Sequence, residues 1–226
     1  MEEIITIILI MLTLLTIFCL YKILNKRGLY FALVMMDLIS FVLSFKISYI
    51  FKMNINLGII PLIASFSILY IFLTKYSAKE IKSLLLITLY ANITAALLLV
   101  VMNFFIPAIT ETISINMQGT FEYNYKILIV YPIIVLLSQL ATAKLYVLLK
   151  EIQDNNTISI ALTYIITGLL YTLVMYAIAY IDIMELKFSL FLGISTYILG
   201  LVITGINILF VNLLNNKKVI KWEISY

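Results

Sequence analysis

Asp37 is the residue whose type and position most directly suggest chemistry. It lies near the middle of the apolar run 29–49. About nine residues, or roughly 14 Å of helix rise, separate it from either membrane surface. An aspartate cannot reach water over that distance, and it costs about 2.5–3.5 kcal/mol at the centre of a membrane helix. Asp37 must therefore be protonated, face a wet cavity or pair with a donor. It is expected either to serve a ligand or a proton, or to bond a neighbouring helix.

Neutral polar residues could complete a site around this carboxyl group. Ser40 and Ser44 follow Asp37 on one helix face, and Tyr30 precedes it, which makes a polar stripe. Hydroxyl residues recur at helical spacing in other runs, where packing of helices is the first explanation. Asp37 would bond the ligand or carry a coupling proton, Tyr70 would stack on the ligand, and neutral groups would donate or accept hydrogen bonds. The ligand-binding residues that we predict are Asp37, Ser40, Tyr70, Gln139, Thr142 and Thr167.

Lys144 is the other charged residue that lies away from the ends of an apolar run. Lys150 follows it about 9 Å further along the helix, so the Lys144 amino group can snorkel to the membrane surface. If Lys144 turned inward instead, it would be the natural partner for Asp37 or for an acidic ligand. Snorkelling is the favoured interpretation.

No set of residues in the sequence suggests catalysis or a metal site. The chain has no histidine, a lone cysteine (Cys19) and no phosphate-binding glycine loop. Aspartyl chemistry inside a membrane would require a second aspartate close to Asp37. We therefore predict that the protein is not an enzyme, with no catalytic residue, no metal and no cofactor, and that it does not bind nucleic acid.

The elements that position these residues are expected to be membrane-spanning helices. Hydrophobic residues make up 64% of the 226-residue chain, and the mean hydropathy is +1.15. A run of about 20 apolar residues crosses a bilayer as a helix. We predict an all-α polytopic bundle of about seven transmembrane helices. The predicted spans are Ile4–Leu24, Leu29–Tyr49, Ile55–Thr74, Leu84–Ile106, Ile127–Leu149, Ile158–Ile181 and Phe188–Leu214.

The chain is expected to form one integral membrane domain over residues 1–226. Residues 1–25 would be an additional N-terminal transmembrane helix, 26–214 a six-helix core and 215–226 a cytoplasmic basic tail. The first run begins with acidic residues and is not expected to be a cleaved signal peptide. The segment Pro107–Tyr125 is predicted to be a surface loop, with an interfacial helix or a lid as the alternatives.

The basic residues indicate the orientation of the protein in a cell membrane. They concentrate in the segments after the first, third, fifth and last runs, and cytoplasmic loops carry such an excess. We therefore predict an N-terminus outside the cell and a C-terminus in the cytoplasm. The residues concerned are Lys22, Lys26, Arg27, Lys75, Lys79, Lys82, Lys150, Lys217, Lys218 and Lys221.

Several short motifs resemble those of the queuosine-precursor transporter family, also called the vitamin uptake transporter family. They are Gly28-Leu29-Tyr30, Lys46, Leu57-Gly58, Tyr76-Ser77-Ala78-Lys79-Glu80 and Ser138-Gln139. The spacing of the apolar runs also resembles this family from about Lys26 to Lys218, with an added first helix. The resemblance implies an importer of a small purine-like precursor without an ATP-binding part of its own.

The chain departs from the family at its acidic positions, as a divergent member would. Tyr70 and Thr74 stand where the family has an Asp and a Glu, Thr142 and Thr167 stand where it has Asp, and Phe41 where it has Asn. We therefore expect uptake of a small polar, purine-like precursor, with the lipid bilayer and a small-molecule ligand as partners. The alternatives are a non-catalytic subunit in a larger membrane complex or a substrate-binding subunit of an energised importer. Further partners left open by the sequence are a second copy of the chain, in a homo-oligomer, and other proteins of a membrane complex.

Overall fold

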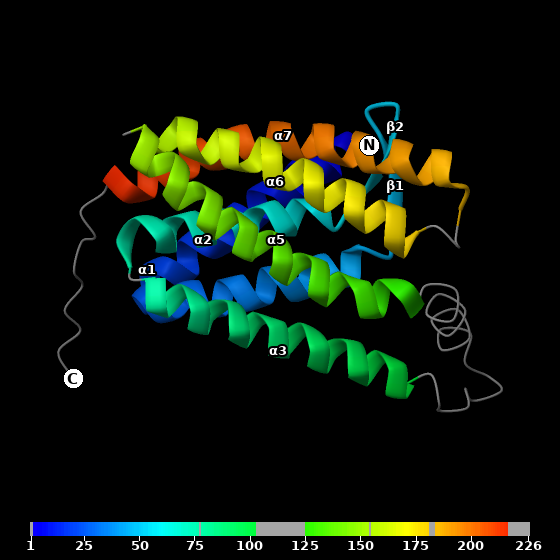
Figure 1. Cartoon of the computed structure of the whole chain (residues 1–226), viewed down its shortest axis with the longest axis horizontal. Helices are drawn as coiled ribbons and strands as arrows, with labels where there is room; N and C mark the ends of the chain where they lie inside the picture. The colour runs from blue at the N-terminus through cyan, green and yellow to red at the C-terminus, as the bar shows by residue number, and fades with distance from the viewer. Residues whose placement is uncertain (1, 77, 103–124, 154, 181–183, 217–226) are drawn as a thin grey trace.

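The computed structural model describes residues 2–76, 78–102, 125–153, 155–180 and 184–216. These residues form the helices α1 (Glu2–Leu43), α2 (Ile59–Lys75), α3 (Ala78–Met102), α5 (Tyr125–Ile152), α6 (Asn156–Ala179) and α7 (Leu186–Asn216), and the strands β1 (Ile47–Ile50) and β2 (Met53–Asn56). Five of the described helices, all except α2, are long and apolar enough to cross a membrane. The protein is therefore a multi-pass membrane protein, and Figure 1 shows its helices lying side by side in one bundle.

Helix α1 contains a sharp turn at Asn25, where φ is 52° and ψ is −129°. Asparagine tolerates a positive φ better than most residues. The backbone doubles back so tightly that a β-carbon on Gly28 would lie 2.0 Å from the carbonyl oxygen of Leu20. The turn therefore requires glycine at position 28. Asn25, where the chain turns, lies between the first two spans predicted from the sequence.

A β-hairpin joins α1 to α2, and the sequence analysis did not predict it. Strands β1 and β2 pair antiparallel, with Ile50 opposite Met53. Phe51 and Lys52 both have a positive φ, at 50° and 62°, as a type I′ hairpin turn requires. Polar and apolar residues alternate along β2, as is typical of a strand, and Ile55 and Asn56 at its end are both buried.

The hairpin corrects the ends of two predicted spans. The second span was expected to continue to Tyr49, but α1 ends at Leu43, and the third was expected from Ile55, but α2 begins at Ile59. Helices α5, α6 and α7 agree with the predicted spans to within a few residues, and α3 begins earlier than predicted, at Ala78. Residues 103–106 of the fourth span, 107–124 of the predicted loop and 217–226 of the tail lie outside the described residues.

Helix α2 is the central element of the bundle. All its residues from Ile59 to Phe72 are buried, and it packs against α1, α3, α5 and α7. Polar side chains on α2 therefore face other helices rather than lipid. By contrast, α3 lies at the edge, and 22% of its membrane-spanning window is buried.

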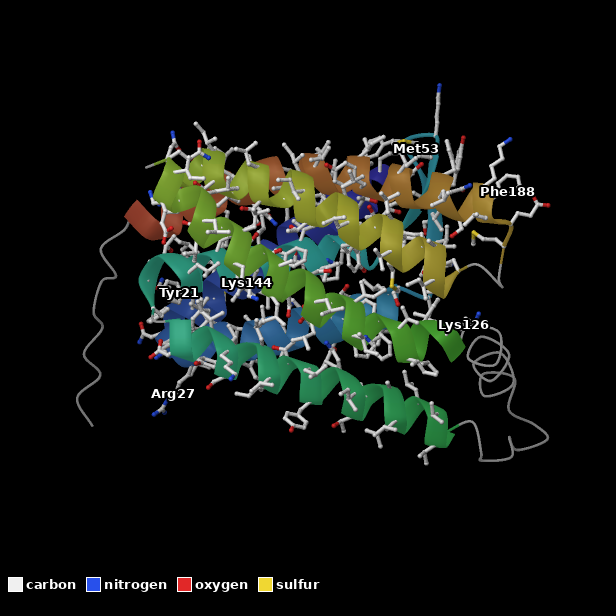
Figure 2. All side chains as sticks on the ribbon, viewed as in Figure 1. Tyr21, Arg27, Met53, Lys126, Lys144 and Phe188 are labelled. Atoms are coloured by element: carbon white, nitrogen blue, oxygen red, sulfur yellow. The ribbon has the colours of Figure 1, made fainter. Side chains whose placement is uncertain are left out.

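The two ends of the bundle carry different elements. Figure 2 shows Tyr21 and Arg27 at one end, and Met53, Lys126 and Phe188 toward the other. We call these the Arg27 end and the hairpin end. At the Arg27 end Lys26 forms an ion pair with Glu80 of α3.

Candidate functional site

Asp37 lies inside the bundle on the second half of α1, and its side chain is completely buried. Gln139 of α5 donates a hydrogen bond from Nε2 to Asp37 Oδ2 at 2.7 Å. The other carboxyl oxygen, Oδ1, is buried and has no hydrogen-bond partner among the described residues. The neutral donor Gln139, not Lys144, is thus the partner of Asp37, and one acceptor position stays open.

Helix α2 contributes Ser65 to the same place. Gln139 Nε2 also lies 3.5 Å from Ser65 Oγ, whose own hydroxyl donates to the carbonyl of Leu62 at 2.8 Å. Tyr131 of α5 donates from its hydroxyl to the backbone oxygen of Asp37 at 3.4 Å. Asp37, Gln139 and Ser65 bring three helices together, and we call them the Asp37 cluster.

The rest of the predicted stripe on α1 makes separate contacts. Ser40 Oγ donates to the carbonyl of Gly58 at the start of α2 (2.6 Å). Ser44 Oγ donates to Phe41 of its own helix at 2.6 Å, and Tyr30 reaches the carbonyl of Glu80 at 3.4 Å. Asp37, Ser40 and Ser44 are all buried, but the structure does not gather their side chains into one binding surface.

Thr142 and Thr167 do meet. Their hydroxyl oxygens lie 3.1 Å apart, with Thr142 of α5 donating to Thr167 of α6. Thr167 donates in turn to the carbonyl of Thr163 at 2.8 Å. This chain of bonds joins two helices and leaves little hydrogen-bonding capacity for a ligand.

Tyr70 of α2 lines a second group of polar residues, against α6 and α7. The side chains here leave only a narrow gap, into which a water molecule does not fit. Three residues that line it carry buried polar atoms without a hydrogen-bond partner in the described structure: the hydroxyls of Tyr70 and Tyr164, and both amide atoms of Asn207. Ser67 and Thr204 also line it. We call these five residues the Tyr70 cavity.

Tyr70 was predicted to stack on a ligand, and in the structure its ring contacts the ring of a neighbouring tyrosine. The rings of Tyr70 and Tyr146 lie 5.5 Å apart and are tilted by 53°. Gly200 of α7 permits the approach of Tyr164, since a β-carbon on Gly200 would lie 2.0 Å from the Tyr164 hydroxyl. Tyr164 and Asn207 are not among the ligand-binding residues predicted from the sequence.

The Asp37 cluster and the Tyr70 cavity lie on different faces of α2. Ser65 belongs to the first and Ser67 to the second, and residues two apart on a helix point about 200° from each other. Polar atoms with open hydrogen-bonding positions therefore flank the central helix on both sides.

The hairpin end carries a third polar group, centred on Asn56, that the sequence analysis missed. Asn56 Nδ2 donates to the carbonyl of Ser44 and to the hydroxyl of Tyr180, both at 2.6 Å. Its Oδ1 accepts from the backbone of Gly58 at 2.9 Å, and its own backbone N–H donates to Thr196 at 3.2 Å. The sequence Asn-Leu-Gly, which begins at the last residue of β2, is the signal that could have indicated a turn held by the Asn56 side chain. The network ties the hairpin to α1, α2, α6 and α7.

The Arg27 end is closed by a lysine. Lys75 at the end of α2 donates from Nζ to the hydroxyl of Tyr21 at 3.1 Å and to the carbonyl of Leu214 at 3.0 Å. Lys144, by contrast, is exposed on the outside of α5. Within the described residues there is no group of three His, Cys, Asp or Glu side chains that could hold a metal ion.

No protein-family model, no curated protein and no solved structure matches this chain. A function must therefore be inferred from the fold and from the polar groups along α2, and the family resemblance stays a prediction.

Proposed function

We propose that the protein is a membrane transporter for a small polar solute, which passes through the bundle beside α2. The observation that carries this proposal is a set of buried polar atoms, on both faces of α2, that have no hydrogen-bond partner among the described residues: Asp37 Oδ1, the hydroxyls of Tyr70 and Tyr164, and the Asn207 amide. Such atoms destabilise a protein in a bilayer, because each buried polar group without a hydrogen bond costs several kcal/mol. A polar solute would supply the missing partners.

In this proposal the two ends of the route would be closed by hydrogen bonds. The Asn56 network would close the hairpin end, and Lys75, which bonds Tyr21 and Leu214, would close the Arg27 end. This arrangement would then correspond to an occluded state. Transport would require the helices around α2 to separate first at one end and then at the other.

A more specific proposal is that the solute is a purine-like precursor of the queuosine type. The motif resemblance alone supports this choice of solute. In that proposal Asp37 accepts a hydrogen bond from the solute or carries a coupling proton. Gln139, Ser40, Thr142 and Thr167 would supply neutral hydrogen bonds once the helices have moved, and Tyr70 would provide a ring face.

The turn at Asn25 supports seven crossings of a cell membrane, with the two halves of α1 as separate spans. We propose that the N-terminus is outside and the C-terminus in the cytoplasm, because Lys22, Lys26, Arg27 and Lys75 lie toward the Arg27 end. Enzymatic reporters fused to the C-terminus test this. A reporter that is active only outside the cell would overturn the orientation.

Uptake of a radiolabelled queuosine precursor into cells that lack other importers tests the transport proposal. Cells with the wild-type protein should accumulate the label, and Asp37→Asn should reduce accumulation at least tenfold at equal protein levels. Thr88→Val is the matched control, because Thr88 is buried on α3 and bonds its own helix at Leu84, 2.9 Å away. Unchanged uptake by Asp37→Asn would exclude a charged role for this residue.

A second candidate is a non-catalytic subunit of a larger membrane complex. The dry packing of Asp37 against Gln139 favours it, since a buried carboxyl bonded to a neighbouring helix can be purely structural. A substrate-binding subunit of an energised importer lies between the two. Stoichiometric partners that purify with the protein, together with absent uptake by the protein alone, would favour these alternatives.

A further inference from the structure

The surface between α3 and α5 contains a groove that the proposed function does not use. It provides about 570 Å³ of space, within the range of roughly 300–1,000 Å³ that is common for small-molecule sites. Leucine, isoleucine, valine and alanine form its walls, and Lys82 of α3 and Lys144 of α5 are its charged members. We call it the α3–α5 groove; its lining residues are Leu73, Ile81, Lys82, Leu85, Leu140, Ala143, Lys144, Val147 and Leu148.

The two lysines are close enough to the helix ends to extend to the depth of the lipid phosphates. Lys82 is about 6 Å of helix rise from the start of α3 at Ala78, and Lys144 is about 9 Å from Lys150. Figure 2 shows Lys144 on α5 toward the end that carries Tyr21 and Arg27, and Lys126 of the same helix toward the other end. Both amino groups can therefore reach the head-group region at the Arg27 end.

The positive charges of Lys82 and Lys144 are not balanced by acidic side chains among the described residues of the groove. No acidic side chain is among the described residues that line it, and the nearby Glu80 is engaged by Lys26. Both lysines are exposed. Two cations at the mouth of an apolar groove match a molecule with one anionic head and an extended apolar tail.

We infer that the α3–α5 groove binds an anionic phospholipid, with its phosphate beside Lys82 and Lys144 and an acyl chain along the apolar walls toward Leu85 and Leu140. The acyl chain gains packing contacts but no hydrophobic driving force, because lipid tails surround it elsewhere in the membrane too. The head-group charge therefore decides which lipid binds. Basic pockets between transmembrane helices select anionic lipids on this principle.

Native mass spectrometry of the full-length protein in detergent tests the inference with two defined lipids, phosphatidylglycerol and phosphatidylcholine. The wild-type protein should retain phosphatidylglycerol at least tenfold more strongly than phosphatidylcholine. The double variant Lys82→Gln/Lys144→Gln should weaken phosphatidylglycerol binding by about tenfold or more, given the attraction of each lysine for an anionic head group. The matched control is Lys22→Gln/Arg27→Gln, which removes two exposed charges at the same end outside the groove and should leave binding unchanged.

A second pair of variants tests the position of the acyl chain without any change of charge. Ala143→Phe fills the groove and should displace phosphatidylglycerol, whereas Ala141→Phe, on an exposed position of α5 outside the groove, should not. Equal phosphatidylglycerol binding by Lys82→Gln/Lys144→Gln and by its control variant would overturn the inference. Equal retention of the two lipids by the wild-type protein would overturn it too. Competition by millimolar inorganic phosphate alone would show an anion site without a lipid. A dimer that Ala143→Phe dissociates would show that a second copy occupies the groove. Each of these results is independent of whether the protein transports a solute.

Discussion

The polar residues of the hairpin end and those beside α2 are equally buried but differently bonded. At the hairpin end the Asn56 amide uses its donor and acceptor atoms on Ser44, Tyr180 and Gly58. Beside α2, Asp37 Oδ1 and the Asn207 amide have no partner in the described structure. The same residue types thus stabilise one region and leave the other with open positions.

This difference separates two uses of polar residues in a membrane bundle. A satisfied network holds helices in one arrangement, because breaking it exposes several donors and acceptors at once. Open positions contribute little to stability, but they can bind a solute that brings its own donors and acceptors. Stability measurements should therefore respond strongly to changes at the hairpin end and weakly to changes in the Tyr70 cavity.

Asn56→Ala should have the largest effect on stability. It removes the amide that joins Ser44, Tyr180 and Gly58, so buried groups lose their partners at a cost of about 3 kcal/mol in total. Thermal unfolding of the purified protein in detergent measures the loss. Asn54→Ala is the control, because Asn54 is an exposed asparagine of the same strand. Similar melting temperatures for the two variants would contradict a stabilising role of the network.

Gln139→Leu should come next, with a loss of about 2 kcal/mol, because it removes the buried amide that donates to Asp37 Oδ2. The neighbouring Ser138→Ala should cost much less, since the Ser138 hydroxyl bonds its own helix at Ile134. Chemical denaturation in mixed micelles can compare the two. If Gln139→Leu were as stable as Ser138→Ala, Asp37 would have another partner.

Removal of single tyrosine hydroxyls should give opposite signs in the two regions. Tyr180→Phe deletes a hydroxyl that bonds Ser44 and Asn56, so a loss of about 1 kcal/mol is expected. Tyr164→Phe deletes a buried hydroxyl without a partner and should be neutral or slightly stabilising. Differential scanning calorimetry of the two variants tests the contrast directly. A destabilised Tyr164→Phe protein would show that the cavity hydroxyl is bonded.

The Thr142–Thr167 contact should have the smallest effect. Hydrogen bonds between membrane helices average about 0.6 kcal/mol, so a double-mutant cycle with Thr142→Val and Thr167→Val should give a coupling energy of that size. The same cycle with Thr142 and Thr172 should give none, because Thr172 bonds carbonyls of its own helix. A coupling above about 2 kcal/mol would place the threonines in a larger network.

The helices themselves could be predicted from hydropathy, because a membrane imposes length and composition on every span. The hairpin could not be predicted in this way. Its strands continue apolar runs, and the alternation in Met53–Asn56 is only four residues long. Positive φ angles at Phe51 and Lys52, which are not glycine or asparagine, give no sequence signal for the turn.

The site shows the same limits. The depth of Asp37 predicts that it needs a partner, and the structure gives it one in Gln139. Thr142 and Thr167 contact each other, and their role toward a ligand stays a prediction. The sequence does not show which helix lies opposite Asp37, so both Gln139 and Lys144 were reasonable partners. Tyr164 and Asn207 were missed because the gap they line depends on Gly200 and on helix positions set by packing.

The burial of α2 has a consequence for the order of synthesis. The ribosome makes α2 before α5 and α7. This helix is therefore exposed to lipid until the later helices are made and pack against it. Its serines suit that delay, because Ser65 and Ser67 bond carbonyls of their own helix. For Asp37, by contrast, the Gln139 amide that donates to its carboxyl group is made 102 residues later. The carboxyl group would therefore be the point at which a chaperone or the insertion machinery has to hold the nascent chain.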